Sequence, residues 1–251
     1  MSETRRPNPT LTLFAHLLSM PEDEINVAEA ALVFAETEYE DLEISFYTSV
    51  LDDLGAEAKR VVGARTSSAP EERIRTLIDW LYRSQDFRGN AEAYYDPRNS
   101  YLNQVLDRKR GIPISLALVL LEVAFRAGVP AEGISFPGHF LVRAGEADRS
   151  VIVDPFHGRI LGQTELEALA SREPQGKDPR KLQPCGKRML LFRLLSNLRN
   201  IYTQQNDAPR VRNVLEFLVA ITPAPELLRE LESLGRSPVS LPKRSPNRAL
   251  N

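Results

Sequence analysis

Apolar residues recur at helical spacing along most of the chain, and this pattern predicts a largely helical protein. Prolines and glycines divide the pattern into separate helices, because proline is tolerated in a first turn and glycine favours a helix end. Helices are therefore expected over residues 11–18, 21–35, 42–55, 70–81, 165–170, 189–202, 210–221 and a last stretch that ends near Leu234. The third of these is expected to stop at Gly55.

The centre of the chain holds one long apolar helix followed by a change of period. Gly111 and Pro113 mark the start of this helix, and Gly128 marks its end. Beyond it, short runs rich in β-branched and aromatic residues are separated by turn formers, which indicates antiparallel strands. These strands are expected over residues 132–136, 140–143 and 151–153. The predicted fold class is therefore α+β, with a helix packed on a small antiparallel sheet.

Three side chains around this helix and sheet could form a catalytic site. Ser115 lies in the first turn of the helix, where free backbone N–H groups favour a developing negative charge. His139 and Asp154 lie on neighbouring strands, so the order is nucleophile, base and orienter. Each residue also has a commoner structural explanation: a local hydrogen bond, a core histidine and a turn. If the catalytic interpretation holds, the three side chains should converge; a Ser115 that points into the core would count against it.

Four motifs in order make the chain similar to a known family. They are Asn99-Ser-Tyr-Leu-Asn-Gln-Val-Leu, Gly111-Ile-Pro-Ile-Ser-Leu-Ala, Phe136-Pro-Gly-His-Phe-Leu-Val and Val153-Asp-Pro-Phe. Together they resemble the SirB-type bacterial family of transglutaminase-like proteins, over roughly residues 40 to 235. The resemblance implies a papain-like or transglutaminase-like core with a helical N-terminal part and C-terminal tetratricopeptide-like helices. It places Ser115 at the nucleophile's position, His139 at the base's and Asp154 at the orienter's.

A serine at the nucleophile's position changes the expected chemistry. A cysteine site starts from a reactive thiolate, whereas a serine must lose its proton to a well-aligned base during attack. The function predicted from the sequence is therefore a non-catalytic transglutaminase-fold protein that binds a protein or peptide. The alternative is a serine-dependent hydrolase, protease or acyltransferase, with Asn103 as a polar accessory. The sequence leaves open whether the protein is an enzyme.

Other binding chemistries find less support in the sequence. A small-molecule or metal-binding protein that retains the cleft stays a third interpretation, and His139, Asp154 and His157 can be drawn as a metal site. No glycine-rich phosphate loop is present, and the basic residues lack the aromatic interleaving of a nucleic-acid surface. We therefore predict no cofactor, no metal and no nucleic-acid or membrane partner. The pattern does not indicate an oligomeric state.

Composition adds a compartment, a charge asymmetry and a division into domains. The single cysteine, Cys185, fits a reducing compartment, and no apolar run is long enough to cross a bilayer, so a cytoplasmic protein is expected. Residues 7–58 hold twelve Asp or Glu and no Lys or Arg. These acids either pack near basic helices or form a face for a basic partner. The predicted domains are 1–174 (transglutaminase-like), 186–240 (tetratricopeptide-like) and a disordered tail, 241–251.

Overall fold

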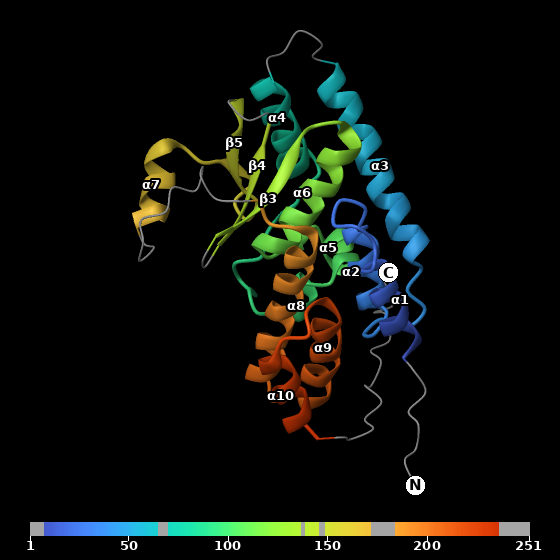
Figure 1. Ribbon diagram of the computed structural model, residues 1–251. Coiled ribbons are helices and arrows are strands. Elements are labelled where there is room, and N and C mark those ends of the chain that lie inside the picture. Colours follow the sequence, from blue (N-terminus) through green and yellow to red (C-terminus); the bar gives the residue numbers. More distant parts are fainter. Residues whose placement is uncertain (1–7, 65–69, 137–138, 146–148, 172–183, 236–251) are drawn as a thin grey trace. The chain divides into compact units, whose positions relative to one another are not determined.

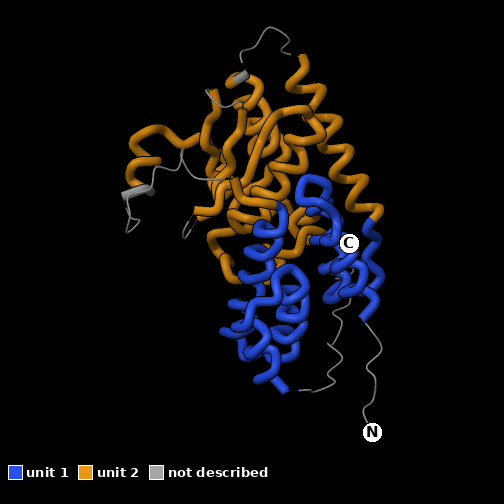
Figure 2. Tube along the Cα trace, in the orientation of Figure 1, with its two compact units in different colours: residues 1–44, 187–251 blue, residues 45–186 orange. Residues whose placement is uncertain are grey.

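The three predicted strands and a fourth, short strand form one antiparallel sheet in a computed structural model of the chain. The structure describes residues 8–64, 70–136, 139–145, 149–171 and 184–235, and the statements below concern these residues. The chain separates into two compact units (Figure 2). Residues 45–186 form the unit that holds the sheet, and residues 1–44 join residues 187–251 in the other.

The sheet and helix α6 form the centre of the first unit and confirm the predicted α+β class. The strands follow the order of the sequence as β3 (Ala131–Phe136), β4 (His139–Ala144), β5 (Val151–Asp154) and β6 (Arg159–Ile160). Val142 pairs with Val153 in the register of β4 and β5. Helix α6 (Pro113–Ala127) ends at Gly128, which adopts a positive φ of 67°. Figure 1 shows α6 and α7 (Gln163–Ser171) on opposite sides of the sheet.

Further helices and a second, minimal sheet complete this unit. Helices α3 (Ile44–Gly63) and α4 (Pro70–Asp79) come first, and α4 continues into a π-helical turn. The segment between this turn and residue 102 contains a two-residue strand and a short 3-10 helix. The elements are the π-helical turn η1 (Trp80–Ser84), β1 (Arg88–Gly89), η2 (Pro97–Asn99), α5 (Leu102–Arg108) and β2 (Arg110–Gly111). Strands β1 and β2 pair in parallel.

The prediction that a helix stops at Gly55 is wrong, because α3 continues to Gly63. Gly55 instead allows α3 to approach α6 closely. A Cβ atom added at Gly55 would lie 2.3 Å from the Cβ atom of Arg126. The Arg126 side chain is held in place by two carboxylates. Its Nε atom donates to Asp52 Oδ1 of α3 at 2.8 Å, and its Nη1 atom donates to Glu122 Oε2 at 2.5 Å. The glycine is therefore required by the packing of two helices, which a local sequence pattern does not reveal.

The second unit is a bundle of five helices among the described residues. These are α1 (Pro9–Leu17), α2 (Val27–Ala35), α8 (Lys187–Gln204), α9 (Ala208–Ile221) and α10 (Pro225–Ser233). Three phenylalanine rings meet edge to face in its core, with Phe217 lying 4.9 Å from Phe14 and 5.0 Å from Phe34. Helix α2 begins at Val27, later than predicted. The Asn26 side chain caps this start by accepting a hydrogen bond from the backbone N–H of Glu29.

Ion pairs connect the acidic N-terminal segment to the basic C-terminal helices within this bundle. Glu38 and Arg210 are both nearly buried, and their closest side-chain atoms lie 2.8 Å apart. Arg188 pairs with Glu22 and also donates to the backbone carbonyls of Leu18 and Met20. These contacts favour the first of the two explanations for the charge asymmetry, in which the acids pack against basic helices.

The two compact units divide the chain differently from the predicted domains. The helices before Ile44 group with the C-terminal helices, although the sequence assigned them to the same domain as the sheet. The predicted tail, 241–251, lies outside the described residues, as do residues 175–183 between the two predicted domains. The predicted boundaries and the tetratricopeptide-like character of the C-terminal helices stay predictions. No helix in the described ranges is long and apolar enough to span a membrane.

The two glycines of α3 provide a matched test of this packing. We expect Gly55→Ala to destabilise the protein by about 1–3 kcal/mol, because the added methyl group overlaps the root of the Arg126 side chain. Gly63→Ala should instead stabilise it by about 0.5–1 kcal/mol, because nothing lies within 4 Å of the new Cβ atom. Thermal unfolding monitored by circular dichroism measures both effects. Equal effects of the two substitutions would contradict close packing at Gly55.

Candidate functional site

Ser115 lies at the third position of α6, as the sequence predicts, but its hydroxyl is enclosed by backbone. The residue is 1% exposed. Its Oγ atom donates a hydrogen bond to the carbonyl of Asn99 at 2.6 Å and accepts one from the backbone N–H of Ile112 at 3.1 Å. Gly111 leaves room for this arrangement, since a Cβ atom there would lie 2.6 Å from Oγ. In this structure, Ser115 is therefore a capping residue that ties the helix start to the preceding loop.

An asparagine network fixes the loop to which Ser115 bonds. Asn99 is fully buried, and its side chain donates to the carbonyls of Ala93 and Tyr94 at 2.7 and 3.2 Å. Asn90 donates from its side chain to Asn99 Oδ1 at 3.0 Å, and its backbone N–H reaches the Gly111 carbonyl at 2.9 Å. The Ser115 bond therefore belongs to a connected set of polar contacts around the start of α6.

His139 is exposed at the first position of β4. It pairs with Phe136 across the β3–β4 hairpin, and the two rings lie 6.4 Å apart. Since alternate residues of a strand share a face, His139 lies on the face of Leu141. Leu141 belongs to a buried cluster with Ile152 and with Leu166 of α7. His139 is therefore placed on the α7 face of the sheet.

Asp154 ends β5 and binds a histidine that the sequence did not assign as the base. Its Oδ2 atom lies 2.7 Å from Nδ1 of His157, while Oδ1 accepts from the backbone N–H groups of Phe156 and His157. Within the described part of the chain, neither Asp154 nor Ser115 forms a hydrogen bond with His139. The structure thus joins Asp154 to His157 and does not join the three predicted residues by direct hydrogen bonds. The catalytic roles of Ser115, His139 and Asp154 stay predictions.

Several buried polar atoms near these residues lack a hydrogen-bond partner within the described ranges. They include Oδ1 of Asn103, the predicted accessory residue, together with the hydroxyls of Ser100 and Tyr82. The ring of Tyr82 packs against Gly158 in the turn after Asp154. Burial raises the pKa of Tyr82, and the negative charge of Asp154 raises it further. Tyr82 therefore keeps its proton at neutral pH.

An aromatic row, formed by Tyr94, Tyr95, Phe156 and His157, lies beside Asp154. Successive ring centroids are 5.3 Å apart for Tyr95 and Tyr94, 5.8 Å for Tyr94 and Phe156, and 5.2 Å for Phe156 and His157. Phe156 lies over Gly89, where a Cβ atom would approach its ring to 2.6 Å. Sequence reasoning missed this row. Two neighbouring pairs of aromatic residues could have indicated it: Tyr94-Tyr95 in a turn-rich segment, and Phe156-His157 directly after Asp154-Pro155.

The described residues offer no group of three or more His, Cys, Asp or Glu side chains arranged to hold a metal ion. His139 and His157 in particular belong to different contacts, one beside Phe136 and the other on Asp154. The site is built from hydrogen-bonded polar residues and aromatic rings.

Comparison with known proteins places this geometry in a family. The profile of the transglutaminase-like superfamily matches residues 46–196, which is more than half of the chain. The chain belongs to the transglutaminase-like superfamily. A UPF0162 protein from Xylella fastidiosa (strain Temecula1) is 35% identical to it over 228 residues, which cover 88% of this chain and 80% of the relative. This transglutaminase-like chain is thus also a member of the UPF0162 family. Of the predicted resemblance, the comparisons support the transglutaminase-like core.

Two other relatives share shorter stretches with this transglutaminase-like chain. A UPF0162 protein from Vibrio cholerae is 35% identical over 132 residues, which cover 51% of this chain and 49% of the relative. F-box only protein 21 from Mus musculus is 45% identical over 76 residues, which cover 30% of this chain and 12% of that protein. No solved structure matches the chain significantly.

The structural role of Ser115 can be tested by removing its hydroxyl. We expect Ser115→Ala to destabilise the protein by about 1–3 kcal/mol, because the buried Asn99 carbonyl and the Ile112 N–H both lose a partner. Ser49→Ala, at an exposed position of α3, should change stability by no more than about 0.5 kcal/mol. Chemical denaturation followed by circular dichroism compares the two variants. Equal stability of both would show that the Ser115 hydroxyl has no structural role.

Proposed function

We propose that this transglutaminase-like protein acts by binding a peptide segment of a partner protein, and not by serine-dependent acyl transfer. The observation that carries the proposal is the state of the Ser115 hydroxyl. It is buried, it donates to one backbone group and it accepts from another. A nucleophile must instead reach the substrate and pass its proton to a base. To react, Ser115 would have to abandon both hydrogen bonds and become accessible.

The aromatic row supports a binding function at the same end of the sheet as Asp154. Tyr94 is 37% exposed and Tyr95 is 64% exposed, so both rings present apolar area to solvent. Tyrosine is enriched at the energetic centres of protein interfaces, because its ring contributes contact area and its hydroxyl a hydrogen bond. His157, held by Asp154 through Nδ1, adds a second ring nitrogen that can hydrogen-bond to a peptide. Apolar side chains of an extended peptide could therefore pack on the tyrosines while its backbone bonds to His157.

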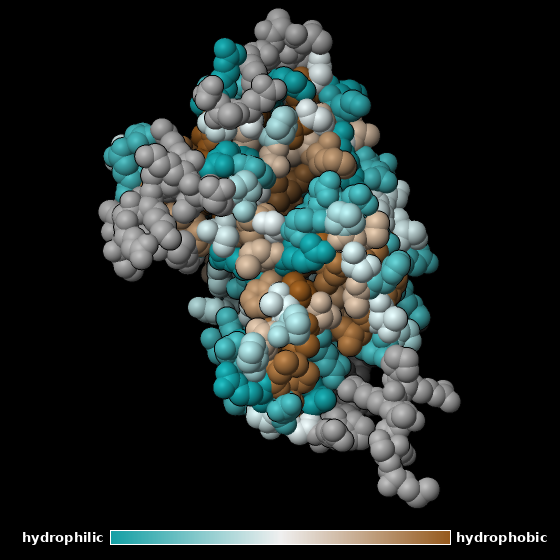
Figure 3. All heavy atoms as spheres, viewed as in Figure 1, coloured by the Kyte–Doolittle hydropathy of each residue, from teal (hydrophilic) through white to brown (hydrophobic). Residues whose placement is uncertain are grey.

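Among the described residues, Phe46 and Tyr47 form a pair of rings in contact, which is shorter than the row of four. On the face shown in Figure 3, apolar residues reach the surface in separate patches among hydrophilic ones. Phe125, near the end of α6, is 81% exposed, more than either tyrosine, and it takes part in none of the ring contacts of the row. Phe125 therefore provides a control for the effect of an exposed aromatic ring alone.

Selection from a random peptide library tests the binding function. We expect the full chain to enrich peptides that bind in solution, and Tyr95→Ala to weaken them at least about tenfold, as for a central interface residue. Phe125→Ala should leave the affinity unchanged. Fluorescence anisotropy with the labelled peptides gives the dissociation constants. If no peptide is enriched, or if Tyr95→Ala and Phe125→Ala bind equally well, the aromatic row is not a peptide site.

Hydrolysis of an activated ester tests the enzymatic alternative. We expect the unmodified protein and Ser115→Ala to release p-nitrophenol from p-nitrophenyl acetate at the same background rate, because the hydroxyl is enclosed. Circular dichroism first establishes that each variant is folded at the assay temperature. A rate above background that disappears in folded Ser115→Ala would overturn the non-catalytic proposal and favour a serine-dependent hydrolase.

A further inference from the structure

A cavity of about 990 Å³ lies on the sheet in the same unit, away from the predicted catalytic residues. It is lined at the end of β4 and the start of β5 by Arg143, Gly145, Ser150 and Val151. His139 and Asp154 stand at the other ends of these two antiparallel strands. The cavity has the size of small-molecule binding sites, which range over roughly 300–1,000 Å³. It is therefore a second place where this chain could bind a ligand.

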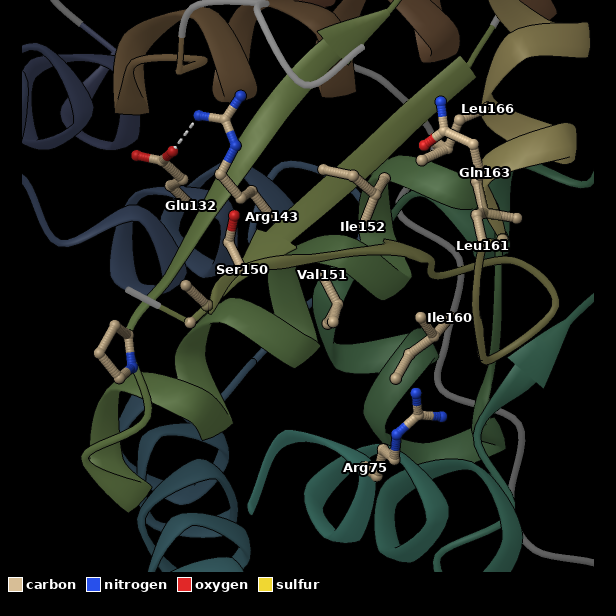
Figure 4. A pocket seen from close by; sticks show the side chains of 14 residues that line it. Arg75, Glu132, Arg143, Ser150, Val151, Ile152, Ile160, Leu161, Gln163 and Leu166 are labelled. Atoms are coloured by element: carbon tan, nitrogen blue, oxygen red, sulfur yellow. Dashed lines mark hydrogen bonds and ion pairs between the residues drawn. The ribbon is translucent and has the colours of Figure 1, made fainter. Parts of the chain in front are cut away.

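Part of the cavity wall is apolar. Ile152 and Leu161 come from β5 and the residue after β6, and Leu166 comes from α7. All three belong to the buried cluster on the α7 face of the sheet. Val151 and Ile160 add partly exposed side chains on the opposite face of the sheet, on the side of Arg75 (Figure 4). An aliphatic group that enters the cavity would therefore remove apolar surface from water.

The charged residues of the lining leave one positive charge without compensation. Arg143 pairs with Glu132 at 2.5 Å on one side of the cavity (Figure 4). Arg75 reaches the lining from α4, and its guanidinium lies beside Ile160 in the same view. No ion pair or side-chain hydrogen bond of Arg75 is found in the part of the chain that the structure describes. A guanidinium group binds carboxylate and phosphate in a bidentate manner, so the lining is complementary to an anion.

From this combination we propose that the cavity binds a small aliphatic anion, with its chain on Val151 and Ile160 and its carboxylate or phosphate on Arg75, which lies on the same side of the sheet. The site does not depend on Ser115 or on the aromatic row, because none of those residues lines the cavity. The protein would then hold a peptide at one end of its sheet and a small acid at the other.

Gly162 offers a way to fill the cavity without disturbing its walls. It belongs to the lining, and a Cβ atom added there meets only Glu165 Oε2 at 3.7 Å, which is ordinary contact. Its φ lies outside the positive range that strains other residues. A leucine at this position should therefore fold normally and occupy space that the ligand needs.

Calorimetric titration of the full chain with octanoate, octyl phosphate and octanol tests the proposal. We expect at least one of the two anions to bind one-to-one and more tightly than octanol, and the tighter one identifies the head group. Arg75→Gln should weaken this anion about threefold to tenfold, while Arg73→Gln, an exposed arginine of α4 outside the cavity, should have no effect. Gly162→Leu should abolish binding of all three compounds and leave peptide affinity unchanged.

Three results would overturn the proposal. The first is the absence of saturable binding for both anions. The second is an equal change in anion affinity in Arg75→Gln and Arg73→Gln, which would show that Arg75 does not bind the anion. The third is unchanged affinity in Gly162→Leu, which would place the ligand outside the cavity. Loss of peptide binding in Tyr95→Ala with anion binding intact would separate this site from the proposed peptide site.

Discussion

The hydrogen bonds of the Ser115 hydroxyl fix the start of α6, and the arrangement around the candidate site depends on them. Helix α6 supplies the longest buried apolar segment of its unit, so its start determines where the preceding loop lies. That loop carries Asn99 and, through the asparagine network, the backbone of Tyr94. A buried hydroxyl with two backbone partners is costly to move, because both partners would lose a hydrogen bond at once. Ser115 is therefore better suited to hold the loop than to attack a substrate.

The two ends of the antiparallel sheet form two separate surfaces. Because β4 and β5 run in opposite directions, the start of one strand and the end of the other lie at the same end of the sheet. One end of the sheet carries His139, Asp154 and the turn with His157. The other end carries the cavity lined by Gly145 and Ser150. A ligand at either end of the sheet can therefore contact residues from several strands without disturbing the buried pair Val142 and Val153 between the two ends. This geometry leaves room for two separate binding sites on one small sheet.

Much of the fold could be predicted because it depends on local patterns. The start of α6 at Pro113 and the three strands that follow it agree with the predicted positions within about one residue. The role of Gly55 could not be predicted, since it depends on Arg126, which lies on a different helix. The hydrogen-bond partners of the candidate site residues could not be predicted for the same reason. The sequence placed Ser115 in the first turn, but only the structure shows that its partner is the carbonyl of Asn99.

The charge distribution along the chain has its physical explanation within the helical unit. The acidic N-terminal segment cannot neutralise itself, because it contains no Lys or Arg between residues 7 and 58. Glu38 lies in a nearly buried position that a lone carboxylate would not tolerate, and Arg210 compensates it from a helix more than 170 residues away. Removing either partner would leave the other as a buried, uncompensated charge. Part of the asymmetry therefore reflects pairing between the two ends of the chain, through Glu22 with Arg188 and Glu38 with Arg210.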